Sequence, residues 1–293
     1  QDVDLILGLY YGAENNGIRF DIPIFNGTQN GTVGWQGSFI QPKETVDTQA
    51  LFGQATWNTT PDLHLTAGAR YTRDKRANIG GRGHGWAYLA TVPAVPIDPG
   101  LDPAAPGSGF NDGCCNDGRY SSSKATGLAR VAFDLSKDAM VYASIATGYK
   151  SGGLQDLGDK YDPETLTSYE LGSKTTLFGG TVTFNNAVYH SRFKGYQFAG
   201  PLMRPDGSRA FGFANAEGAT VSGLESELAA RLTPSDKLNV TLALTKAKLG
   251  KLLAFSRDYT LPACTDPVGS LVTAQCLDVS GNEMPHAPRV AAT

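Results

Sequence analysis

The stretch that decides the fold is Leu63-His64-Leu65-Thr66-Ala67-Gly68-Ala69-Arg70-Tyr71-Thr72. Its odd positions, from Leu63 to Tyr71, are apolar, and its even positions are polar or glycine. A period of two over these ten residues is typical of a β-strand with one apolar and one polar face, not of an amphipathic helix. The stretch therefore predicts a strand whose two faces meet different environments.

The same alternation recurs about ten times, with centres near residues 7, 51, 69, 127, 144, 171, 189, 223, 244 and 290. Every second connection is a short turn, at 58–62, 135–137, 179–180 and 233–237. The other connections are long, at 12–45, 77–120, 151–163, 198–213 and 250–283. Short turns on one side and long loops on the other predict an all-β, antiparallel transmembrane barrel with periplasmic turns and extracellular loops. The segments 17–25 and 31–41 are alternatively strand extensions above the membrane.

The positions of the charges agree with this interpretation. On the apolar faces, charges occur only near the long-loop ends, at Asp47, Arg73, Lys75, Lys246 and Lys248. A Lys or Arg at the bilayer midplane of a barrel costs about 2–4 kcal/mol, and about 0–1 kcal/mol near the interface. One strand, 181–197, is irregular, because Asn186 and His190 interrupt its apolar face.

The opposite faces have charges at mid-strand, which predicts a polar lumen. The residues expected to face it are Arg70, Arg130, Glu170, Lys174, Glu225, Glu227 and Arg231. Two interpretations stay open for them: contact with the contents of the lumen, or cross-strand ion pairs that set the register. A soluble β-sandwich would place its apolar face inside instead.

Composition excludes several other classes of protein. Hydrophobic residues make up 41% of the chain, yet no apolar run approaches the roughly 20 residues of a spanning helix. The net charge of -3 gives no general attraction to nucleic acid. No basic and apolar leader begins at Gln1, and the chain stops at Thr293 inside an expected strand, so we expect a fragment of a longer protein.

The four cysteines all lie in expected long loops, which suits an oxidising exterior. We expect a disulfide between Cys264 and Cys276, whereas the pairing of Cys114 and Cys115 stays open. The four histidines are scattered and show no metal-ligand spacing, so we expect neither a protein-bound metal nor a cofactor. No nucleophile and base stand together, so we do not expect an enzyme.

Five stretches together resemble TonB-dependent outer-membrane receptors, especially their iron-complex branch. They are Ala50-Leu51-Phe52-Gly53-Gln54-Ala55 with 65–71, 141–153, Pro163-Glu164-Thr165-Leu166-Thr167-Ser168-Tyr169-Glu170-Leu171-Gly172-Ser173-Lys174, 221–227 and 281–288. The resemblance implies a barrel of 22 strands with an N-terminal plug, of which residues 1–293 would be a partial barrel domain. The plug, the segment that contacts TonB and the final strand are not in this chain.

The resemblance also implies a function, which is energised uptake of a scarce ligand across the bacterial outer membrane. We expect a ferric siderophore or related iron chelate as ligand, the TonB complex as a partner through the N-terminal region, and contact with outer-membrane lipid. Aromatic and cationic side chains in the first two long loops suit flat, anionic chelates: Trp35, Arg82, His84, Trp86, Tyr88, Arg119 and Tyr120. The alternatives are a surface loop with incidental aromatic residues and, for the whole protein, a passive porin-type channel.

Overall fold

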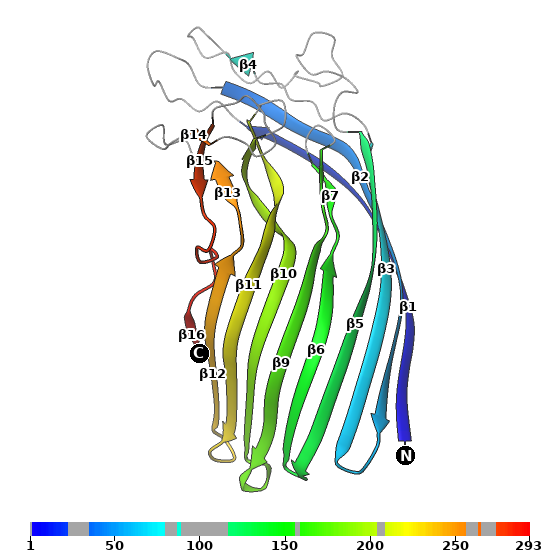
Figure 1. Cartoon of the computed structure of the whole chain (residues 1–293), viewed down its shortest axis with the longest axis vertical. Coiled ribbons are helices and arrows are strands. Elements are labelled where there is room, and N and C mark those ends of the chain that lie inside the picture. Colours follow the sequence, from blue (N-terminus) through cyan, green and yellow to red (C-terminus); the bar gives the residue numbers. More distant parts are fainter. Residues whose placement is uncertain are drawn as a thin grey trace.

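The computed structural model describes residues 2–22, 35–79, 87–88, 117–155, 159–203, 209–255, 263–264 and 274–293. Ten antiparallel strands follow one another around a single curved sheet in the order of the chain (Figure 1). They are β1 (Asp2–Ile22), β2 (Trp35–Asn58), β3 (Leu63–Ile79), β5 (Gly118–Ser136), β6 (Ala139–Lys150), β9 (Glu164–Leu177), β10 (Val182–Met203), β11 (Arg209–Arg231), β12 (Lys237–Leu249) and β16 (Val290–Ala292). The predicted strand class, order and approximate count are confirmed.

Short elements lie at the end of the sheet where the long connections are. They are β4 (Ala87–Tyr88), which pairs with β2; the hairpin β7 (Gly153–Leu154) with β8 (Lys160–Tyr161); and the small sheet of β13 (Leu253–Phe255), β15 (Ala274–Asp278) and β14 (Ala263–Cys264). The described residues contain one 3-10 turn, η2 (Phe178–Gly180), and no α-helix. No helix in this part of the chain is long and apolar enough to cross a membrane.

The strands continue past the ends predicted for them, so several expected loops are shorter. β1 and β2 remain paired from Ile18↔Gln41 to Ile22↔Gly37, which confirms the alternative interpretation as strand extensions for these residues; 23–25 and 31–34 lie outside the described residues. Residues 198–213 were expected as a loop, but β10 and β11 stay paired as far as Met203↔Arg209. A backbone ladder satisfies its own hydrogen bonds in water as well as in lipid, so a hairpin has no reason to end at the membrane surface.

One face of the sheet, which we call the convex apolar face, presents aliphatic and aromatic side chains outward. Cross-strand partners share a face, and one continuous row of partners is Val3, Trp57, Leu65, Val131, Ala143, Leu171, Val188, Leu224, Leu244 and Val290. Leu51 and Leu171 on this face are 60% and 58% exposed. Large apolar groups left open over ten strands fit a lipid-facing surface.

The opposite face, which we call the concave polar face, has its own repeated packing. The aromatic rings of Phe52, Tyr142 and Tyr189 each lie over the glycine directly across from them on the next strand, Gly8, Gly172 and Gly223. A Cβ at any of these glycines would lie within 3.0 Å of the ring it faces. The glycines therefore make room for aromatic side chains that lie flat against the inner wall of the sheet.

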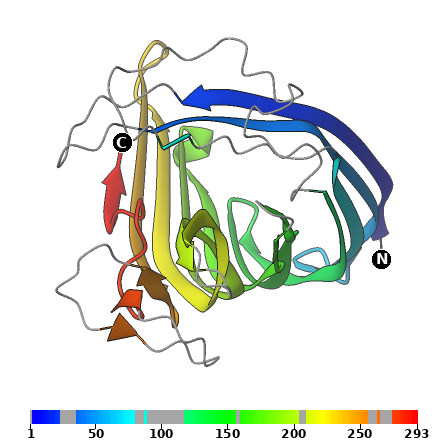
Figure 2. The ribbon, with the colours of Figure 1, turned by 90° about the horizontal axis from the view of Figure 1, so that it is seen from above.

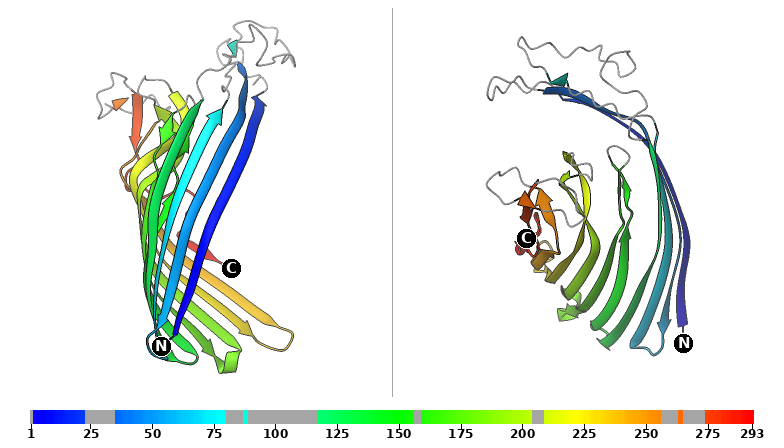
Figure 3. Two further views of the ribbon diagram at one scale, coloured as in Figure 1. Left: turned by 90° about the vertical axis from the view of Figure 1, so that its right-hand side faces the viewer. Right: turned by 45° about the horizontal axis from the view of Figure 1, so that its top comes forward.

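The sheet is an open trough, not a closed barrel. β1 pairs only with β2 and β16 only with β12 among the described strands, and the two edges face a gap. Figure 2 shows the trough from above, with the upper parts of β1 and β2 running across its open side. Figure 3 shows the same curvature in two further views.

Candidate functional site

A hairpin lies inside the trough at the end with the long connections. It consists of β7 and β8, with Gly153 opposite Tyr161 and Leu154 opposite Lys160. It contacts β3 and β5 on one wall and β11 on the other, and Figure 2 shows β7 within the curve of the sheet. The sequence predicted residues 151–163 only as a long loop, so the inward position of this hairpin is a new feature.

Three side-chain amides hold the hairpin in place by forming hydrogen bonds with backbone groups, as a neighbouring strand would. Asn215 accepts from the Asp162 N–H (2.8 Å) and donates to the Asp162 carbonyl (2.9 Å). Gln155 makes the same pair of bonds with the backbone of Phe213, at 2.6 and 3.1 Å. The buried Gln197 donates to the carbonyls of Ser151 (2.9 Å) and Asp162 (3.0 Å), one on each side of the hairpin.

Close packing also fixes the base of the hairpin. Gly152 and Gly153 are buried, and a Cβ at Gly152 would collide with the Tyr161 carbonyl and the Tyr120 hydroxyl. The buried Glu164 accepts a hydrogen bond of 2.7 Å from the Gln197 N–H. These contacts make the hairpin part of the wall, because it is hydrogen-bonded to β10 and β11.

The hairpin presents aromatic surface next to a cation. The Tyr161 ring stacks on Phe213, with centroids 4.8 Å apart and an angle of 29° between the rings. Burial raises the pKa of the Tyr161 phenol, the nearby Arg76 partly opposes this, and Glu44 adds to it. The Arg76 Nε is buried and has no hydrogen-bond partner among the described residues. A stacked ring pair beside a cation can hold a flat, anionic ligand.

Two of the predicted ligand residues lie side by side on β5 but face opposite ways. Tyr120 contacts Gly152 at the base of the hairpin, on the concave polar face. Arg119 has the alternate orientation and is exposed. The structure therefore brings Tyr120, but not Arg119, next to the Tyr161 and Phe213 pair.

The other predicted ligand residues lie at the edge of the described chain or outside it. Trp35 on β2 pairs in register with Tyr88 on β4, so the two long connections that contain them meet at this point. Arg82, His84 and Trp86 lie outside the described residues, and their contact with a ligand stays a prediction.

Below the mouth, three predicted lumen residues contact aromatic side chains on the concave polar face. The Arg130 guanidinium lies 4.1 Å from the centre of the Tyr142 ring. The Tyr142 hydroxyl donates a hydrogen bond of 2.7 Å to Glu170. Arg70 lies over the rings of Tyr10 and Phe52, at 5.5 and 5.6 Å.

The remaining predicted lumen residues are on the same face. Lys174 and Glu227 both lie opposite Asn185, on either side of it, and Glu225 and Arg231 alternate with the apolar positions of β11. Within the described part of the chain, none of the seven predicted lumen charges has an ion pair within 4.0 Å. Aromatic rings and hydroxyl groups are the partners of Arg70, Arg130 and Glu170 instead.

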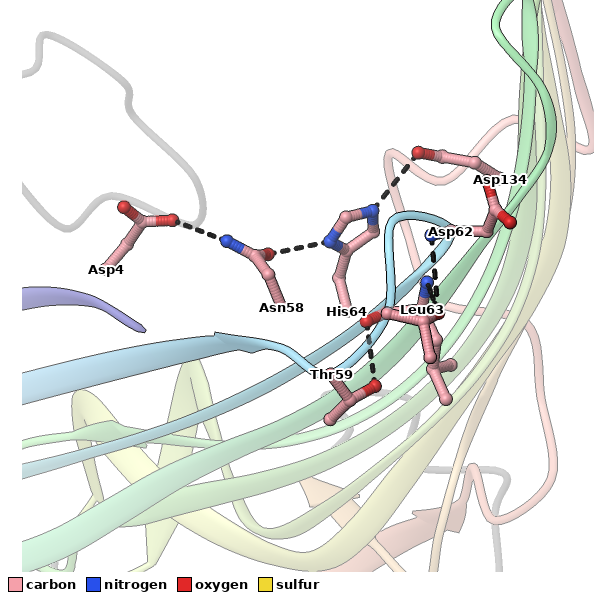
Figure 4. Close-up of polar contacts among 8 residues, drawn as sticks. Asp4, Asn58, Thr59, Asp62, Leu63, His64 and Asp134 are labelled. Atoms are coloured by element: carbon pink, nitrogen blue, oxygen red, sulfur yellow. Dashed lines mark hydrogen bonds and ion pairs between the residues drawn. The ribbon is translucent and has the colours of Figure 1, made fainter. Parts of the chain in front are cut away.

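A second polar chain crosses four strands at the short-turn end (Figure 4). Asn58 donates to Asp4 (3.2 Å), its amide oxygen faces His64 Nδ1 (2.7 Å), and His64 Nε2 faces Asp134 (3.1 Å). Because the Asn58 nitrogen is used by a carboxylate, both ring nitrogens of His64 face oxygen atoms that can accept a hydrogen bond. Sequence reasoning missed this chain, because its members are spread over 131 positions from Asp4 to Asp134.

The described residues include two of the four cysteines and contain no group of side chains that could hold a metal ion. Cys264 pairs in register with Ala274, two positions from Cys276 on β15; the disulfide stays a prediction, and Cys114 and Cys115 lie outside the described residues. Among the described residues, no three His, Cys, Asp or Glu side chains are placed to hold a metal ion.

Comparison with known proteins gives one family. A family model described as a TonB dependent receptor-like beta-barrel matches residues 1–293. The pesticin receptor of Yersinia pestis is 24% identical over 241 residues, which are 79% of this chain and 29% of that receptor. The ferric-pyoverdine 358 receptor of Pseudomonas putida is 28% identical over 110 residues, which are 37% of this chain and 13% of that receptor.

A solved structure shows the same fold. The siderophore receptor PiuA from Acinetobacter baumannii matches with a TM-score of 0.62 and 17% identity, over 99% of this chain and 40% of that one. This chain thus spans less than a third of the length of either curated relative.

Proposed function

The chain belongs to the TonB-dependent receptor β-barrel family, and we propose that it forms part of an outer-membrane receptor for energised uptake of a ferric siderophore or similar iron chelate. The family consists of receptors and transporters rather than enzymes. Because the whole chain matches this family, a passive porin is not favoured.

The names of the relatives support an iron complex as the ligand. One curated relative is a receptor for ferric pyoverdine, and PiuA is a siderophore receptor. Both likenesses are below 30% identity, so they support a class of ligand and not a particular chelate. The TonB complex would supply energy through parts of the receptor outside residues 1–293.

The observation that supports this function most strongly is the hairpin at the mouth. Tyr161 and Phe213 give a stacked aromatic surface, and Arg76 gives a positive charge beside it. A siderophore complex with aromatic or carboxylate groups would stack on the rings and pair with the guanidinium. The amides of Gln155, Gln197 and Asn215 keep this surface in place before the ligand arrives, which reduces the ordering cost of binding.

The function can be tested by uptake in cells that produce the complete receptor, with and without TonB. The panel contains labelled ferric siderophores, haem and cobalamin. We expect TonB-dependent uptake of a ferric siderophore, and uptake that does not require TonB would contradict the proposal.

The role of the hairpin needs a binding measurement with the purified receptor. Loss of one aromatic stacking partner is worth about 0.5–1.5 kcal/mol, so Phe213→Ala should weaken ligand binding by up to roughly tenfold. Phe178→Asn is a matched control, because Phe178 is an exposed aromatic residue at the opposite end and asparagine tolerates its positive φ of 52°. If the Phe213→Ala and Phe178→Asn receptors bind the ligand with equal affinity, the hairpin is not part of the binding site.

A further inference from the structure

A group of polar and basic side chains lies on the convex apolar face of β10, β11 and β12. Two rows of cross-strand partners form it: His190, Ser222 and Lys246 in the first row, and Arg192, Thr220 and Lys248 in the second. We call these six residues the convex basic patch. Lys194, exposed and one convex position further along β10, extends it.

Hydrogen bonds orient the arginine of this patch. His190 Nδ1 lies 2.7 Å from the Ser222 hydroxyl, and Arg192 Nε donates to His190 Nε2 at 3.1 Å. Because Nε2 accepts, Nδ1 is the ring nitrogen that donates to Ser222. The chain from Ser222 to Arg192 therefore fixes the guanidinium group and leaves its terminal nitrogens available to a ligand.

The patch keeps an excess of positive charge within the described chain, although Glu283 lies opposite Lys248 and interacts electrostatically with Lys246 and Lys248. Glu283 and Glu217, the carboxylates closest in sequence and register, are paired with Arg289 (2.6 Å) and Lys251 (3.7 Å). Among the described residues, Arg192, Lys194, Lys246 and Lys248 form no ion pair within 4.0 Å. Four cations thus remain on one outward surface.

The patch begins where the apolar part of the face ends. On β12 the convex positions Leu238, Val240, Leu242 and Leu244 are followed directly by the two lysines. These four positions span about 20 Å at roughly 3.3 Å per residue, close to the roughly 25 Å apolar band of a membrane barrel. The patch therefore lies at the depth of the lipid head groups, on the side of the long connections.

The same depth on the other side of the trough is different. There the convex charges are Asp47 on β2 with Arg73 and Lys75 on β3, and Lys75 is the direct cross-strand partner of Asp47. Serines 121 and 123 follow on β5. The β10 to β12 side therefore has the larger excess of positive charge, with four cations against two cations and a carboxylate on the other side.

We propose that the convex basic patch binds the phosphate groups of the anionic glycolipid in the outer leaflet of the outer membrane. Arg192 and Lys248 flank Thr220, so a phosphate over that hydroxyl would receive charge-assisted bonds from both sides. Ser222, Thr220 and the adjacent Thr167 are available to the sugar. The assignment to the outer leaflet rests on the proposed function, which sets the long connections outside the cell.

The test uses the purified complete receptor and measures bound lipid by native mass spectrometry. The probes are bisphosphorylated lipid A, dephosphorylated lipid A and phosphatidylglycerol. We expect the receptor to retain bisphosphorylated lipid A at least tenfold more than either other lipid. Arg192→Gln with Lys248→Gln should remove that preference, whereas Lys75→Gln, a convex lysine at the same depth, should keep it.

Two further measurements keep the result interpretable. Resistance to unfolding on heating in detergent shows whether the double variant has folded, and Lys246→Gln alone should give a smaller loss of lipid A if folding fails. Equal retention of the three lipids, or equal loss in the Lys75→Gln control, would overturn the proposal. This measurement uses no iron chelate and no TonB, so a negative uptake experiment would not change its result. Preferential retention of phosphatidylglycerol would contradict the proposed binding of the outer-leaflet glycolipid.

Discussion

The convex and concave faces of the same strands use polar side chains in different ways. On the convex face, Asn186 accepts a hydrogen bond of 2.7 Å from Ser226 on the adjacent strand. This polar group in the apolar band therefore has a hydrogen-bond partner on the neighbouring strand. On the concave face, Arg130, Tyr142 and Glu170 form a chain across three strands. Asn186 is thus satisfied by one neighbouring hydroxyl, as a polar group in lipid requires, whereas the concave side chains join into a chain across three strands.

Cross-strand hydrogen bonds also explain why the alternation of β10 is irregular. Asn186 and His190 interrupt the apolar alternation of β10, yet both lie on the convex apolar face. Each is bonded to a serine on β11, at 2.7 Å in both cases. The interruption is thus not an error of register but a pair of cross-strand polar contacts.

The largest effect is expected when polarity is changed at two adjacent positions of β5, one on each face. Ala129 lies on the convex apolar face and Leu128 on the concave polar face. Ala129→Arg should lower the free energy of unfolding by about 2–4 kcal/mol, because the charge would lie near the bilayer midplane. Leu128→Arg should cost less than about 1 kcal/mol although it removes the larger apolar side chain. Denaturant unfolding of the complete receptor in vesicles measures both, and equal losses would contradict the assignment of the faces.

A smaller effect is expected for the aromatic packing of the concave face. Gly172→Ala would place a Cβ 2.6 Å from the Tyr142 ring and so move its hydroxyl away from Glu170. Overpacking of this kind costs about 1–3 kcal/mol. Gly68→Ala is the control, since its new Cβ would meet its closest neighbour at 3.5 Å, an ordinary contact. If both variants unfold at the same denaturant concentration, the packing of the aromatic rings does not require glycine at the positions they cover.

At the short-turn end, the polar chain through His64 should stabilise the sheet more than an exposed ion pair does. His64→Phe would leave Asn58 and Asp134 without their shared hydrogen-bond partner, and we expect a loss of about 1–2 kcal/mol for the two part-buried hydrogen bonds. Lys137→Gln removes an ion pair of 3.6 Å whose lysine is 90% exposed, so it should cost no more than about 0.5 kcal/mol. Hydrogen exchange of β3 near Leu63 should increase in the His64→Phe receptor alone. Equal exchange in both variants would show that the chain of Figure 4 is not a structural link.

The smallest effect concerns pH at the hairpin. Burial raises the pKa of Tyr161, so the folded state favours the neutral phenol. The stability from this group is therefore complete below the ordinary tyrosine pKa of about 10 and is lost as pH rises through the higher folded value. Denaturant midpoints above pH 10 should fall less in Tyr161→Phe than in the unaltered receptor. Identical pH dependence would show that Tyr161 is not buried in this way.

Most of the wall was predictable, because alternation is a local signal. Leu63 to Tyr71, the two lysines of β12 and the positions of the short turns all follow from a period of two and from the cost of charge in lipid. The resemblance to the TonB-dependent receptors then agreed with the family match over residues 1–293.

The site was less predictable, because its contacts join residues far apart in the chain. Gln197 and Asn215 hold a hairpin that begins more than 40 residues before them, and nothing in the periodicity of either strand marks them. Gly152 and Gly153 were a local signal of close packing that sequence reasoning did not use. Arg192 was missed for a related reason, since it follows His190 in a strand whose alternation is interrupted.

The order of the strands also has a consequence for how the chain folds. Neighbours in the sheet are neighbours in the sequence, so each pairing closes only the connection between two strands. The join of β3 to β5 must close residues 80–117, roughly nine times the length of the turn at 59–62 that joins β2 to β3. Loop-closure entropy makes this join about 2 kcal/mol less favourable to begin. The join of β12 to β16, which closes residues 250–289, has a similar cost, so assembly should pause at these two seams, with the strands from β5 to β12 pairing between them.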